Sequence, residues 1–92
     1  KAAPPPPPAP RAKVPTGPAR RRAEAAEAAL ARATAAMAEI DRKLTDPVIF
    51  AKDPAQAAAL GRKREAAQLA VNAAEREWLE AQEAYEALRT DA

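Results

Sequence analysis

Basic side chains gather at two places in this 92-residue sequence, and phosphate binding is the chemistry that they could perform. One group flanks a short Pro-containing segment in mid-chain: Arg42, Lys43, Lys52, Arg62, Lys63 and Arg64. The other is the run Arg20, Arg21 and Arg22. Because Lys and Arg contact the phosphates of DNA and RNA, all nine are candidate nucleic-acid-binding residues. Lys63 and Arg64 have no acid three or four positions away that could neutralise them within one helix.

Ion pairing within the fold is the competing interpretation for both groups. In an antiparallel pair of helices, Lys63 and Arg64 come within reach of acids in the other helix, Glu39 and Asp41. The sequence leaves phosphate binding and ion pairing equally open for these two bases. The arginine run lies opposite a later row of acids: Glu80, Glu83 and Glu86. Ion pairing is the preferred interpretation there, because cations at a helix N-terminus are mildly disfavoured without a partner.

Catalytic and metal-binding chemistry has little support in the composition. The sequence contains no His and no Cys, which removes the commonest general base, the commonest metal ligand and any disulfide. Carboxylates such as Glu75 and Glu77 fit a solvated helix face. We therefore expect no catalytic residue, metal site, cofactor or small-molecule substrate, and no enzyme activity. No apolar run approaches the roughly 18 residues of a membrane span, so no membrane partner is expected either.

The elements that must position the bases are two long helices. Small or apolar residues recur at spacings of three and four in two stretches: Ala26, Leu30, Ala33, Met37, Ile40, Leu44, and Leu60, Ala67, Val71, Ala74, Trp78, Ala81, Tyr85, Leu88. This period is what two helices need to stay in contact as they wind around each other. The sequence predicts an all-α fold, a two-helix antiparallel coiled-coil hairpin over residues 18–90. We expect one helix over 18–45, a tip turn over 46–53 and a second helix over 54–89.

Pro residues set the limits of the predicted elements. Asp53 and Gln56 flank Pro54 in a pattern typical of a helix start with a capping box. Asp46 and Pro47 repeat the cap-plus-Pro arrangement and predict one short helical turn as far as Phe50. We expect Ile49 and Phe50 to fold over the end of the coil and to shield Leu44 and Leu60.

The apolar residues predict a slim seam, since 29 of them are Ala and only fifteen are larger. If the chain folds back near Lys52, Ala26 faces Trp78 and Ala19 faces Tyr85, so that each large residue meets a small one. Trp78 and Tyr85 are therefore expected to be core residues rather than stacking platforms for bases. Leu69 and Leu79 do not fit the seam.

The first 17 residues have a different character. Pro4 to Pro8, with Pro10 and Pro15, favour polyproline II, and this segment is predicted to be a disordered linker. A ligand for a proline-recognition domain is the alternative. Residues 1–22 hold six bases and no acid, whereas residues 23–92 hold nine bases and thirteen acids. The chain begins at Lys1 without Met, and we expect a fragment of a larger soluble protein.

The segment from about Ala19 to Leu88 resembles the C-terminal coiled-coil domain of bacterial ABC-F ATPases of the Uup-like group. The likeness is carried by the stretch LTDPVIFAKDPAQAAALGRKREAAQLAVNAAEREWLEAQEAYEAL, above all by Asp46-Pro47, Phe50 and Asp53-Pro54. Glu75-Arg76-Glu77-Trp78, followed by Tyr85, adds to it. The resemblance implies a domain of a cytoplasmic ATPase that acts on DNA or ribosomes. The Walker and signature motifs are absent, so ATP and Mg would belong to the parent protein.

Two functions follow as hypotheses. The first is a nucleic-acid-binding arm of an ABC-F ATPase that contacts DNA or ribosomal RNA through the mid-chain tip and the basic N-terminal tail, with the arginine run as further candidate residues. The alternative is a protein-interaction or regulatory arm that docks on the parent ATPase domains, or on another protein, through Leu69, Leu79 and the acidic end. A plain structural spacer is a third possibility. The sequence does not distinguish DNA from RNA as the target.

Overall fold

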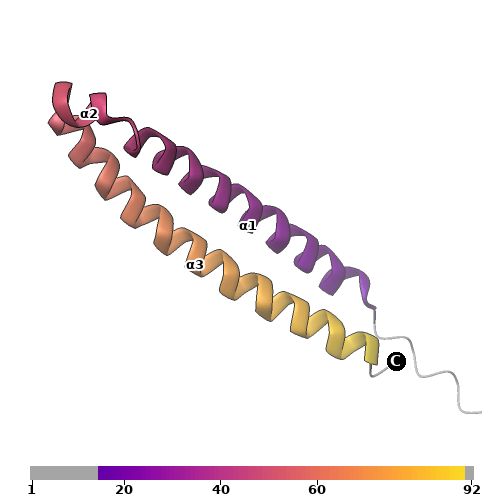
Figure 1. Ribbon diagram of the computed structural model, residues 1–92. Coiled ribbons are helices and arrows are strands. Elements are labelled where there is room, and N and C mark those ends of the chain that lie inside the picture. Colours follow the sequence, from indigo (N-terminus) through magenta and orange to yellow (C-terminus); the bar gives the residue numbers. More distant parts are fainter. Residues whose placement is uncertain (1–14, 91–92) are drawn as a thin grey trace, which may run out of the picture.

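The computed structural model describes residues 15–90 as a helical hairpin (Figure 1). Helix α1 spans Gly17–Leu44, the short helix α2 spans Pro47–Lys52, and helix α3 spans Pro54–Thr90. The two long helices run antiparallel side by side, and α2 lies at the closed end between them. The predicted all-α hairpin is confirmed, whereas most of the predicted Pro-rich linker lies outside the described residues.

The start of α1 is capped only weakly. Pro18 occupies the first turn, where its missing N–H is tolerated. Thr16 itself has helical backbone angles and its side chain caps no amide, while its carbonyl accepts from the Arg20 N–H at 2.9 Å. The first turn holds no acid. The arginine run thus lies at a helix start whose first turn has no acid to balance it.

The two later helix starts rely on Asp side chains. The Asp46 carboxylate accepts from the Val48 N–H at 3.0 Å, and the Asp53 carboxylate accepts from the Gln56 N–H at 3.0 Å. The Asp53 cap is confirmed. The reciprocal bond of the predicted capping box is not formed, because the Asp53 N–H already donates to the Ile49 carbonyl at 2.9 Å. One backbone bond therefore joins the end of α2 directly to the start of α3.

The core of the hairpin is a thin seam made mostly of Ala. The buried apolar residues within 15–90 are these six: Ala23, Ala26, Ala57, Leu60, Val71 and Ala81. Ala23, Ala26 and Ala81 form one cluster, and Trp78 and Tyr85 pack against it while staying partly exposed. This arrangement agrees with the predicted register, in which Ala26 faces Trp78. It also confirms that both rings serve packing, although neither is enclosed completely.

The expectation that Ile49 and Phe50 together cover the end of the coil is wrong for Phe50. Ile49 is half-buried and Leu60 is buried, but Phe50 is 54% exposed. Successive residues of a helix point roughly 100° apart, so a turn that presents Ile49 to the seam directs Val48 and Phe50 away from it. Within residues 15–90, no helix has the length and apolar character to cross a membrane.

Candidate nucleic-acid interface

The nine candidate bases fall into two groups at opposite ends of the hairpin. The tip bases come from the last turn of α1, the last residue of α2 and the early turns of α3: Arg42, Lys43, Lys52, Arg62, Lys63 and Arg64. The open-end arginines, Arg20 to Arg22, lie in the first turns of α1. At about 1.5 Å of rise per residue, roughly 30 Å of helix separates Arg22 from Lys43. The two groups cannot form one continuous patch (Figure 1).

Two of the tip bases form ion pairs with acidic residues. Arg64 crosses from α3 to α1, where its Nε donates to Asp41 Oδ1 at 2.6 Å. Arg42 pairs with Glu39 one turn earlier in α1. The hydrogen bond from Arg42 holds the pKa of Glu39 below its usual value. The ion-pairing interpretation is therefore confirmed for Arg64, and Arg42 has a partner in its own helix.

The other four tip bases are exposed, and no carboxylate within residues 15–90 lies within 4.0 Å of them: Lys43, Lys52, Arg62 and Lys63. The acids proposed as partners for Lys63 are already bound to Arg42 and Arg64. Asp46 and Asp53, which also lie at the tip, accept from backbone amides at helix starts. Of these four bases, Lys43 is close enough to Glu39 for its charge to help lower the pKa of that carboxyl. The tip thus keeps four exposed bases outside ion-pair distance of any described carboxylate, and Asp46 and Asp53 bind backbone amides instead.

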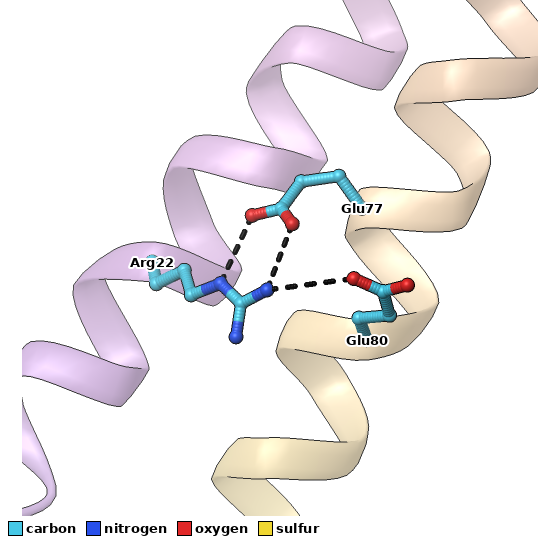
Figure 2. Close-up of polar contacts among 3 residues, drawn as sticks. All are labelled: Arg22, Glu77 and Glu80. Atoms are coloured by element: carbon cyan, nitrogen blue, oxygen red, sulfur yellow. Dashed lines mark hydrogen bonds and ion pairs between the residues drawn. The ribbon is translucent and has the colours of Figure 1, made fainter.

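The open end shows the opposite arrangement (Figure 2). Arg22 donates through Nε and Nη2 to the two carboxylate oxygens of Glu77, at 2.9 and 2.8 Å, and its Nη2 lies 3.8 Å from Glu80. The hydrogen bond to Arg22 lowers the pKa of Glu77, and the same bond raises the pKa of Arg22. Of the three predicted acids, Glu80 is confirmed as a partner of Arg22, whereas the prediction is wrong for Glu83 and Glu86, which lie within 4.0 Å of no arginine of this run; Glu86 pairs with Arg89 instead. Glu77 was missed, because the long Arg side chain reaches one turn beyond the residue it faces.

The other two open-end arginines stay within α1. Arg20 pairs with Glu24 at 3.0 Å, one turn along the same helix. The Arg21 guanidinium lies over the start of the helix, where its Nη1 would be 3.2 Å from a side-chain carbon placed on Gly17. No carboxylate of the described residues lies within 4.0 Å of Arg21. Of the open-end arginines, only Arg21 has its charge uncompensated in this part of the chain.

This arrangement of side chains suits electrostatic binding better than catalysis or metal binding. Within residues 15–90, no group of His, Cys, Asp or Glu is placed to hold a metal ion. The carboxylates whose pKa values shift, Glu39 and Glu77, are exposed and shift downward, so they stay ionised at neutral pH. A general acid or base needs a pKa near the working pH. The tip can attract and hold an anionic surface.

The sequence pattern missed one feature of the tip, namely the exposed apolar residues Val48 and Phe50 on α2, 49% and 54% exposed. The signal was present: three consecutive apolar residues in a six-residue helix cannot all face one seam. Leu69 and Leu79 of α3, which did not fit the seam, are 69% and 53% exposed.

Fold and site together define a two-helix coiled-coil hairpin with a basic tip. Comparison with known proteins assigns it to no family, since no family model, no curated protein and no solved structure matches the chain. The function must be inferred from the side chains themselves.

Proposed function

We propose that this hairpin is a nucleic-acid-binding arm whose tip contacts the phosphates of DNA or ribosomal RNA. One observation carries the proposal: Lys43, Lys52, Arg62 and Lys63 are exposed at the closed end without a carboxylate of the described residues within 4.0 Å. A base without an acidic partner can neutralise a phosphate and release its counterion without first breaking an ion pair.

The distribution of charge along the hairpin favours an approach with the tip first. Residues 41–64 hold six bases and three acids, whereas residues 75–90 hold five acids and two bases. A polyanion is attracted to the first segment and repelled by the second. At physiological ionic strength, salt screens the attraction or repulsion between charges beyond about 8 Å. This distance is short compared with the roughly 55 Å length of α3. Each end of the hairpin therefore acts on a ligand independently.

The wider setting of the proposal comes from the resemblance to the coiled-coil arm of Uup-like ABC-F ATPases. In that setting the hairpin belongs to a cytoplasmic ATPase, the Pro-rich segment links it to an ATPase domain, and ATP and Mg bind elsewhere in the parent protein. The arm itself contributes binding rather than catalysis.

The salt dependence of binding tests the proposal. Replacing Lys52, Arg62 and Lys63 with Gln should flatten the slope of log K against log salt on duplex DNA by about two to three units. Affinity should fall similarly for unrelated sequences, because phosphate contacts do not read bases. Helicity should hardly change, since Gln is nearly as good a helix former as Lys or Arg. Titrations at several salt concentrations give the slope.

A matched control removes the same charge elsewhere. Arg21, Arg32 and Arg76 are also exposed, and no carboxylate of residues 15–90 lies within 4.0 Å of them. Changing all three to Gln should leave the slope nearly unaltered. If the control flattens the slope and the tip variant does not, the tip is not the interface and the open end becomes the candidate.

A second candidate function rests on Leu69 and Leu79, which expose more than half of their surface on α3. They would dock the arm on the parent ATPase domains or on another protein. Leu69→Gln with Leu79→Gln should then abolish association with the ATPase domains in sedimentation, while nucleic-acid affinity stays unchanged. Unaltered association in this variant would remove the docking function.

A further inference from the structure

Phe50 is an exposed aromatic residue on α2, at the same end of the hairpin as the tip bases. It lies in α2, two residues before Lys52, and 54% of it is exposed. The other two aromatic residues of the chain, Trp78 and Tyr85, pack against the Ala23–Ala26–Ala81 cluster. Phe50 therefore has no packing role comparable to theirs.

The helix that carries Phe50 is held firmly enough to present it. The Asp46 side chain caps the start of α2, and the Asp53 N–H bonds to the Ile49 carbonyl at its end. Ile49 is half-buried toward the seam. The ring is thus directed outward by a turn fixed at both ends.

The surroundings of the ring identify the kind of partner. Lys43, Lys52, Arg62 and Lys63 leave the tip positively charged, which favours a partner that is itself an anion. Val48 is also exposed, but it lies two residues from Phe50 in the helix, and residues at this spacing do not share a face. The tip therefore lacks the continuous apolar face by which amphipathic helices enter a membrane interface. One exposed aromatic residue on α2, at the same end of the hairpin as these bases, suits a nucleotide, with its planar base and adjacent phosphate.

We propose that Phe50 stacks on an unstacked nucleobase, so that the tip prefers single-stranded or looped nucleic acid to continuous duplex. The inference rests on the proposed nucleic-acid-binding function and specifies its target. In this arrangement the tip bases Lys43, Lys52, Arg62 and Lys63 contact phosphates of the strand on either side of the stacked nucleotide. A base within a continuous duplex is stacked on both sides and offers the ring no face.

Substitution of the ring provides the test, with the 92-residue chain and two probes, oligo(dT) and a duplex of the same length. Phe50→Ala should weaken binding to oligo(dT) by roughly 5-fold to 150-fold, the range for loss of one stacked base, with its salt slope unchanged. Duplex binding should change little. Phe50→Trp should retain affinity for oligo(dT), and its additional emission should be quenched on binding. Val48→Ala, on another face of the same helix, is the matched control and should bind like the parent.

The outcomes separate this inference from the function on which it rests. If Phe50→Ala binds oligo(dT) like the parent while the Gln variant of Lys52, Arg62 and Lys63 loses affinity, the phosphate contacts stand and the stacking is overturned. If the parent binds neither probe at low salt, the proposed function itself fails. Phe50-dependent binding to phosphatidylserine vesicles, or Phe50-dependent dimerisation in sedimentation, without any binding to oligo(dT), would assign the ring to a membrane or to a second copy and overturn the inference.

Discussion

The closed end and the open end of the hairpin carry the same kinds of charged residue but use their acids differently. At the open end Glu77 and Glu80 receive Arg22, so base and acid neutralise each other across the two helices. At the closed end Asp46 and Asp53 bind backbone amides, and several bases keep no acidic partner in the described part of the chain. The availability of a basic residue thus depends on what the neighbouring acids bind, which a count of charges does not reveal.

The largest expected effect concerns the packing of Trp78 against the Ala23–Ala26–Ala81 cluster at the open end. Trp78→Ala should lower the free energy of unfolding by about 2 to 3 kcal/mol, somewhat below the range for a fully enclosed ring because Trp78 is partly exposed. Thermal melting followed by circular dichroism measures the change. Leu79→Ala, at the exposed neighbouring position, should alter the melting temperature far less. Equal effects of both substitutions would show that the seam does not depend on Trp78.

A smaller effect is expected at the closed end, from the cap of α3. Asp53→Ala removes the acceptor of the Gln56 N–H and should cost about 1 kcal/mol of stability in a urea titration. Asp53→Asn should retain the cap and most of the stability, because Asn caps helices nearly as well as Asp.

The Asn variant also sharpens the comparison of the two ends. It removes one negative charge beside the tip bases while keeping the helix start, so affinity for nucleic acid should rise modestly at low salt. An unchanged affinity would mean that the charge of Asp53 does not contribute to the electrostatic field at the bound phosphate.

The smallest effect concerns pH and the open-end ion pair. Arg22 lowers the pKa of Glu77 in the folded state relative to its ordinary value of 4.5. Because the pKa of Glu77 is lower in the folded state than in the unfolded state, its ionised side chain stabilises the hairpin at pH values above 4.5. This stabilisation is lost as the pH falls through the folded-state pKa. The melting temperature of the parent should therefore decrease on acidification below about pH 4.5.

Glu77→Gln should reduce this acid sensitivity. Glu75→Gln is the control, because no base of residues 15–90 lies within 4.0 Å of Glu75. Identical acid titrations of the melting temperature for the parent and both variants would rule out a contribution from the Arg22–Glu77 pair.

The parts of this structure that could be predicted from sequence are those set by local rules. The period of the apolar residues gave the two helices and the placement of Ala26 beside Trp78. The Asp53-Pro54 pattern gave the start of α3, because a carboxylate three residues before an amide hydrogen can always reach it.

The parts that could not be predicted depend on rotation and reach in three dimensions. The orientation of α2 about its own axis is set by its packing, so Ile49 rather than Phe50 turns toward the seam. Arg22 has long rotatable bonds, and Glu77 and Glu80 both lie within its range. The sequence could not decide whether Lys63 or Arg64 pairs with an acid of α1. In the structure Arg64 binds Asp41.

The distribution of buried residues along α1 has a mechanical consequence. Its buried residues, Ala23 and Ala26, lie in its first half, whereas Leu30, Met37, Ile40 and Leu44 of the remainder are only half-buried. Regions with little buried apolar surface open locally at lower free energy than the rest of a fold. Within α1, the half that leads to the tip therefore opens locally more easily than the half at the open end, whereas α3 has buried residues at the tip as well, namely Ala57 and Leu60. An arm of this kind can yield through α1 near the tip while α3, with buried residues along its length, keeps the direction of the arm.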